Sequence, residues 1–69
     1  MTDTTKLRAL INDSGLKLSF IANQLGITPF SLTKKINNVT EFKSSEISKM
    51  CEILCIDSLE VKDEIFFVN

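Results

Sequence analysis

Residues 18–38 of the chain read LSFIANQLGITPFSLTKKINN, and this stretch decides the fold. Its first half spaces apolar residues at i, i+3, i+4 and i+7, which is one face of a helix formed by Leu18, Ile21, Ala22 and Leu25. Gly26 is well placed to end this helix, because glycine adopts a left-handed backbone conformation at little cost. The small side chain of Ala22 allows a second helix to approach closely.

The second helix of this stretch is predicted to follow almost at once. Thr28 is a good N-cap, and Pro29 at the first helical position loses only an N–H that has no helical partner. Only Gly26 and Ile27 separate this cap from the preceding helix. So short a connection predicts a sharp helix–turn–helix corner with Ile27 tucked inside it.

The outer face of this second helix is polar and contains no acidic residue. At about 100° per residue, Lys34 lies opposite the apolar pair Leu32 and Ile36, and Lys35 lies at the boundary between the two faces. Short polar groups and one aromatic ring flank Lys34, namely Phe30, Ser31, Asn37 and Asn38. This composition suits a helix that enters a DNA groove, although any solvated helix face also needs polar residues.

Helical spacing recurs on both sides of this stretch. Before it, Leu7, Leu10 and Ile11 mark a helix that Thr2 or Thr4 can cap and Gly15 can end. After it, residues 37–43 are expected to form a loop anchored by Phe42. A fourth helix then begins at about Ser44 or Ser45, with an apolar face made of Ile47, Met50, Cys51 and Leu54.

A short fifth helix is expected to be capped by Asp57 or Ser58 and to run toward Glu64, before an apolar end at residues 65–68. That end either closes the core over the first helix, which we favour, or forms part of a dimer contact. The 69 residues, with 43% hydrophobic side chains, two glycines and one proline, predict one all-α domain over 1–69. With neither a signal peptide nor an apolar run of about 20 residues, we expect a soluble, cytoplasmic protein with no membrane contact.

The net charge of −1 conceals an asymmetry along the chain. Residues 1–43 hold six basic and three acidic side chains, whereas residues 44–69 hold two basic and six acidic ones. Because a polyanion is attracted by the local field, a basic first part remains compatible with DNA.

No residue pattern in the sequence indicates catalysis, a metal site or a cofactor. The chain has no histidine, no glycine-rich phosphate loop and no nucleophile elbow, so we expect neither an enzyme nor a small-molecule substrate. Cys51 and Cys55 lack further ligands for a metal, and their i, i+4 spacing on one helix is too long for a disulfide. They are expected to be core or near-core thiols in a reducing compartment.

The stretch at residues 18–38 resembles the lambda-repressor-like (Cro/repressor, XRE-type) helix-turn-helix family, especially small phage-encoded regulators. The matching positions are Leu18, Ile21, Ala22, Leu25, Gly26, Ile27, Thr28, Leu32 and Ile36, and the later segments SSEISKMCEIL and IFF fit as well. The resemblance implies a compact five-helix DNA-binding domain with the helix-turn-helix at about 17–37. It also implies that the third helix lies in the major groove, and that the protein binds a pseudo-palindromic operator as a homodimer.

Within that frame, the residues expected to touch DNA are Thr28, Ser31, Lys34 and Asn38, with Pro29 beside them. Lys34 can donate to guanine O6 and N7, and Asn37 or Asn38 can reach a phosphate or a base. Phe30 either packs on a thymine methyl or folds onto a neighbouring helix. The expected phosphate contacts are Lys17, Ser19, Lys35 and Lys43, with ordinary solubilising surface as the close alternative for each.

The third helix contains neither Arg nor Gln, two of the commonest base-reading residues, so specificity must come from other side chains. Together with the acidic end of the chain, this motivates an alternative hypothesis. In that alternative, the helix-turn-helix scaffold serves protein–protein interaction, as an antirepressor or an adaptor.

Overall fold

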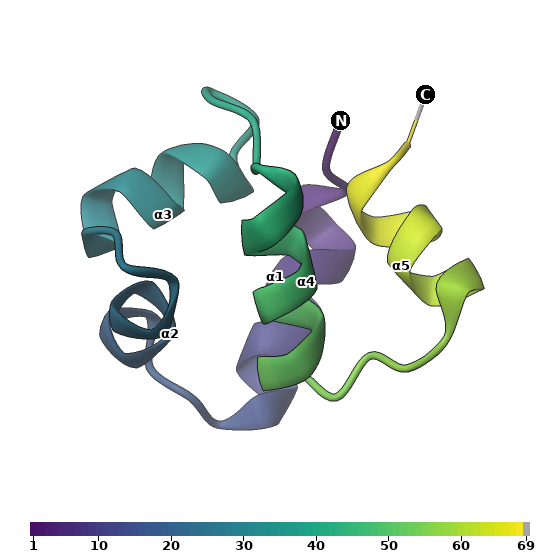
Figure 1. Ribbon diagram of the computed structural model, residues 1–69, viewed down its shortest axis with the longest axis horizontal. Helices are drawn as coiled ribbons and strands as arrows, with labels where there is room; N and C mark the ends of the chain where they lie inside the picture. Colours follow the sequence, from purple (N-terminus) through teal and green to yellow (C-terminus); the bar gives the residue numbers. More distant parts are fainter. Residues whose placement is uncertain (69) are drawn as a thin grey trace.

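A computed structural model describes residues 1–68 as five α-helices joined by short connections (Figure 1). The helices are α1 (Thr4–Ser14), α2 (Leu18–Leu25), α3 (Pro29–Ile36), α4 (Ser44–Ile53) and α5 (Leu59–Phe66). Residues 1–68 contain no strand. The predicted all-α architecture with five helices is confirmed.

The helices surround one shared core. α2 packs against α3 and α4, and α1 contacts α3 and α5. As Figure 1 shows, α2 and α3 lie at one end of the molecule, whereas α5 lies at the other end with the N-terminal segment beside it. The loop at residues 37–43 connects the α2–α3 end to the central helix α4.

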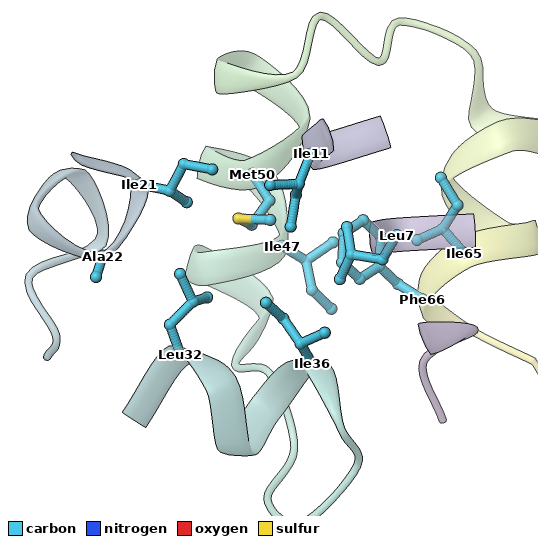
Figure 2. Packing of buried hydrophobic residues seen from close by; sticks show 10 residues of the cluster. All are labelled: Leu7, Ile11, Ile21, Ala22, Leu32, Ile36, Ile47, Met50, Ile65 and Phe66. Atoms are coloured by element: carbon cyan, nitrogen blue, oxygen red, sulfur yellow. The ribbon is translucent and has the colours of Figure 1, made fainter. Parts of the chain in front are cut away.

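Each helix contributes two side chains to the buried core, which explains why the apolar spacing of the sequence predicted the helices well. Figure 2 shows these ten residues converging between the helices. They are Leu7, Ile11, Ile21, Ala22, Leu32, Ile36, Ile47, Met50, Ile65 and Phe66. Ala22 is fully buried, in agreement with the prediction that a small side chain is needed there.

The helix ends follow the sequence signals with one correction. Gly15 and Gly26 adopt left-handed conformations, with φ of 73° and 72°, and end α1 and α2. The cap of α1 is Asp3, not Thr2 or Thr4, because the Asp3 carboxylate accepts the backbone N–H of Lys6 at 3.0 Å.

The two threonines proposed as caps have other partners. Thr2 is buried, and its backbone is hydrogen-bonded to the side chain of Asn38. The hydroxyl of Thr4 donates to the backbone carbonyl of Ile36 at 2.6 Å, which fastens the start of α1 to the end of α3. Both contacts join segments more than 30 residues apart, which local spacing cannot anticipate.

The apolar C-terminal segment closes the core. Ile65 and Phe66 are buried, and the Phe66 ring meets the Phe42 ring edge to face with centroids 5.5 Å apart. The carbonyl of Ile65 accepts the backbone N–H of Asp3 at 2.6 Å. Ile65 and Phe66 therefore take the favoured core-closing role, and Phe42 anchors its loop as predicted.

The two cysteines differ in environment. Cys51 lies half-buried on α4, where burial raises the pKa of its thiol against the opposing effect of the Lys62 charge. Cys55 is exposed and lies beyond the end of α4 with a left-handed φ of 57°, so its expected place in or near the core is wrong. The reason is that α4 ends at Ile53, and the reversal of the chain turns Cys55 outward.

None of the helices in the described residues is long and apolar enough to cross a membrane.

Candidate nucleic-acid interface

The corner between α2 and α3 is tightly held. The backbone N–H of Ile27 donates to the carbonyl of Ala22 at 3.0 Å, and Ile27 packs half-buried against the core. The hydroxyl of Thr28 accepts the backbone N–H of Ser31 at 3.1 Å, and Pro29 is the first residue of α3. The predicted cap, proline and turn are confirmed, and together they fix the direction in which α3 leaves the corner.

The side of α3 that faces away from the core forms the candidate interface. We call it the α3 outer face and define it by Thr28, Pro29, Phe30, Ser31, Lys34 and Asn37. Leu32 and Ile36, on the opposite side of α3, are fully buried. Thr28, Pro29, Phe30 and Asn37 are exposed, whereas Ser31 and Lys34 are partly exposed. The wheel geometry predicted from the sequence therefore holds for this face.

Phe30 is solvent-exposed, with 74% of its surface accessible, so it does not fold onto a neighbouring helix. The ammonium of Lys34, one helical turn further along, lies over the Phe30 ring at 5.3 Å from its centroid. A cation in this position is attracted to the electron-rich face of the ring. The α3 outer face thus presents an aromatic ring and a cation as neighbours.

Lys35 does not belong to this face. Its ammonium is buried, lies 2.9 Å from the Glu46 carboxylate and donates to the Glu41 carbonyl at 3.0 Å. Lys35 thus ties α3 to α4 and to the loop between them, and we remove it from the candidate phosphate contacts. Helical geometry predicted that Lys35 lies at the boundary between the polar and apolar faces of α3. In the structure, its ammonium lies on the inner side, where it pairs with the Glu46 carboxylate.

Glu46 completes this buried network. Its carboxylate also accepts the backbone N–H of Lys43 at 2.8 Å, which satisfies a free N–H at the start of α4. Burial by itself raises the pKa of Glu46, but the hydrogen bonds from Lys43 and Lys35 and their positive charges outweigh it, so the pKa lies below its usual value. The carboxylate is therefore ionised and holds the C-terminal half of α3 in place.

The two asparagines after α3 have different surroundings. The side-chain oxygen of Asn37 accepts a hydrogen bond from the Arg8 guanidinium at 2.9 Å, and both residues are exposed. The side-chain amide of Asn38, although the residue is also exposed, is hydrogen-bonded to the backbone of Thr2. Asn38 thus clamps the N-terminal segment, and because it is exposed its contact with DNA stays a prediction.

Arg8 is a candidate that the sequence reasoning missed. It lies on α1, outside the stretch that resembles a DNA-binding unit, yet its side chain reaches the end of α3 through Asn37. The one available signal was that Arg8 is the only arginine in the chain. Guanidinium groups are frequent ligands of phosphate and guanine, so the position of Arg8 beside α3 makes it a further candidate for the interface.

Two lysines occupy unusual positions at helix starts. Lys17 and Lys43 are the exposed N-cap residues of α2 and α4, where a positive charge opposes the helix dipole. The first turn of α2, which includes exposed Ser19, receives no side-chain capping hydrogen bond. No ion pair within the part of the chain that the structure describes involves Lys17, Lys34 or Lys43. These lysines are open to an anion.

Charge is segregated between the two ends of the molecule. Residues 14–40, which contain α2 and α3, include no acidic residue. The acidic side chains Asp57, Glu60, Asp63 and Glu64 gather on α5 and just before it, at the opposite end in Figure 1. A polyanion is therefore attracted to the α2–α3 end and repelled from α5.

The chain matches no protein-family model, no curated protein and no solved structure. Among residues 1–68, no three acidic or cysteine side chains gather closely enough to hold a metal ion. The features of the molecule that bear on function are therefore the α3 outer face, the lysines beside it and the distribution of charge.

Proposed function

We propose that the protein is a sequence-specific transcriptional regulator of the Cro/repressor type that binds double-stranded DNA. In this proposal, α2 and α3 form a helix-turn-helix, and α3 enters the major groove. The observation that carries it is the exposed α3 outer face, which has a cation, hydroxyl groups and an aromatic ring but no acidic side chain. The resemblance of residues 18–38 to that family supports the same function.

The side chains of the α3 outer face divide into two kinds of contact. Lys34 is suited to donate to guanine O6 and N7, while Ser31 and Thr28 can serve either a base or a phosphate. Asn37 and Arg8, which are already hydrogen-bonded to each other, extend the surface at the end of α3. Lys17 and Lys43 supply phosphate contacts that depend on charge and not on base sequence.

The fixed position of α3 supports a function in recognising DNA bases. Both ends of α3 are fixed, by the Thr28 cap at its start and by the bond from Thr4 to the Ile36 carbonyl at its end. The buried ion pair of Lys35 with Glu46 holds the same helix to α4. A helix fixed at both ends presents its side chains in one geometry, which lowers the entropic cost of recognition.

The small size of the domain bears on how many copies would bind DNA. One small domain makes few phosphate contacts, so two copies on a pseudo-palindromic operator would gain the affinity that one copy lacks. We therefore propose a homodimer on DNA, acting in the cytoplasm. The proposed function is one of binding, with no catalysis and no cofactor.

An amide NMR titration of the labelled protein with a generic DNA duplex tests the proposal. At low salt, the shifts are expected to cluster at residues 17–19 and 28–37 and to fade as salt rises, because phosphate contacts release counterions. An absence of shifts at low salt, or shifts confined to α5, would contradict DNA binding. Shifts at Arg8 would add α1 to the interface.

The alternative function, protein–protein interaction, is favoured by one observation. α5 combines acidic side chains with exposed apolar ones, of which Leu59 is 70% accessible. In that case a protein partner would contact α5, and the α3 outer face would be ordinary surface. The substitution Lys34→Ala separates the two functions, because it weakens DNA binding in the first and has no effect on the partner in the second.

A further inference from the structure

The neighbouring side chains of Phe30 and Lys34 form the most unusual feature of the α3 outer face. Leaving a large apolar ring 74% accessible forgoes the stabilisation that its burial would supply. The ring is also fixed in direction, because Pro29 and the Thr28 cap set the backbone before it and the Lys34 ammonium lies over one of its faces. The ring thus projects from the helix in a defined position.

The chemistry of this pair matches two features of the DNA major groove. Thymine presents an apolar 5-methyl group there, and guanine presents the acceptors O6 and N7. An exposed phenyl ring gains by packing on a methyl group, and an ammonium gains by donating to the two acceptors. Neither group of the pair suits cytosine, whose exocyclic amine is a donor.

The spacing of the pair fits bases that are neighbours in the sequence. The Lys34 ammonium lies 5.3 Å from the Phe30 centroid. Successive bases of one strand are separated by about 3.4 Å along the helix axis. A separation of 5.3 Å lies between one and two such steps, so the pair can contact two adjacent base pairs, whereas bases three steps apart lie beyond its span.

We propose that Phe30 and Lys34 act together to read a thymine next to a guanine. Phe30 packs on the thymine 5-methyl, and Lys34 donates to O6 and N7 of the neighbouring guanine. This inference rests on the proposed function and adds the base step that the protein recognises. Exclusion of water at the groove strengthens the attraction between the ammonium and the ring, so each contact supports the other.

Modified bases test the inference on the full chain. An operator is first selected from a random DNA library, and each thymine in it is then replaced in turn by deoxyuridine, which lacks only the 5-methyl group. We expect one thymine per half-site whose replacement weakens binding about fourfold, the equivalent of one buried carbon at about 0.8 kcal/mol. Replacing the adjacent guanine by 7-deazaguanine, which removes N7 and leaves O6, is expected to weaken binding about fivefold, the low end of about 1–3 kcal/mol for a complete bidentate contact.

Variants assign the two effects to their side chains. Phe30→Ala should bind the thymine and deoxyuridine operators equally, and Lys34→Ala should lose the sensitivity to 7-deazaguanine. Phe67→Ala is the matched control, because Phe67 is also exposed but follows α5 at the other end of the molecule, and it should keep both sensitivities.

The outcomes distinguish this inference from the proposed function. If the chain selects no operator, the proposed function fails and the inference fails with it. If an operator is selected but no thymine responds to deoxyuridine, or the responsive thymine and guanine are not neighbours, only the inference is overturned. The deoxyuridine series uses the unaltered chain, so its result does not depend on the folding of a variant.

Discussion

The side-chain amide of Asn38 is hydrogen-bonded to both backbone polar groups of Thr2. Its oxygen accepts the Thr2 N–H and its nitrogen donates to the Thr2 carbonyl, each at 2.8 Å. Asn38 makes these bonds from a left-handed conformation with φ of 63°, directly after the end of α3. The left-handed backbone of Asn38 reverses the chain after α3, and its side chain holds the N-terminal segment, 36 residues away in the sequence.

Substitutions at Asn38 should separate these two contributions to stability. Asn38→Gly keeps the left-handed conformation at no steric cost but loses both bonds, so we expect the free energy of unfolding to fall by about 1–2 kcal/mol. Asn38→Ala loses the bonds and also strains the backbone, which should cost about 1 kcal/mol more. Urea unfolding of the two variants measures the difference. Equal stability of the two variants would show that the backbone conformation carries no cost.

The ion pair of Lys35 with Glu46 should make stability depend on pH. The folded protein holds the pKa of Glu46 below its usual value, so the unfolded chain takes up a proton first as pH falls. The contribution of Glu46 is therefore complete above the unfolded pKa of about 4.3 and is lost as pH falls through the folded pKa. Urea unfolding at pH 6 and at successively lower pH should show a steeper loss for the wild type than for Glu46→Gln. Parallel curves for the two proteins would refute this origin.

The two partners of the same ion pair should be coupled in their effects on stability. Lys35→Met leaves the Glu46 carboxylate buried without its cation, and we expect a loss of about 3 kcal/mol in the free energy of unfolding. The double variant Lys35→Met with Glu46→Gln should lose less than the sum of the two single variants. Lys49→Met is the control, because the Lys49 pair with Glu52 is exposed and contributes about 0–1 kcal/mol. Strictly additive losses would contradict coupling between the partners.

The sequence predicted those parts of the fold that depend on neighbouring residues. Gly26, Thr28 and Pro29 each act within one helical turn, so the corner between α2 and α3 could be placed before the structure was known. The buried side of α3 followed from the spacing of Leu32 and Ile36 in the same way. The same helical spacing was sufficient to predict which side chains form the α3 outer face.

The errors arose where distant segments meet. Lys35 lies at the edge of the apolar face, and its burial depends on Glu46, whose position is set by the length and path of the intervening loop. The bonds of exposed Asn38 to Thr2 were missed for the same reason, because they depend on the N-terminal segment that lies beside it. Asparagine is common in the left-handed position after a helix, so residue type favoured a structural function for Asn38.

Ala22 provides a test of the close contact on α2. Its side chain is fully buried, so Ala22→Leu should force α2 away from its neighbours and lower the free energy of unfolding by about 1–3 kcal/mol. Ala9→Leu is the matched control, because Ala9 is exposed on α1 and the same substitution there should change stability by less than about 0.5 kcal/mol. Thermal unfolding followed by circular dichroism measures both variants. Equal stability of Ala22→Leu and the wild type would mean that the core has room for the larger side chain.

The salt dependence of DNA affinity should distinguish the phosphate contacts from the base contact. Each phosphate contact contributes about 0.9 to the slope of log affinity against log salt concentration. Lys17→Ala and Lys43→Ala should each lower the slope by about that amount and weaken binding to every DNA sequence alike. Lys34→Ala should instead cost about 1–3 kcal/mol on the selected operator and less on unrelated DNA, because its contact is with a base. Lys62→Ala on the acidic helix α5 should leave the slope unchanged, since α5 lies at the opposite end of the molecule from α2 and α3. A uniform effect of all four variants would indicate only a general attraction between charges. It would contradict the phosphate contacts assigned to Lys17 and Lys43 and the base contact assigned to Lys34.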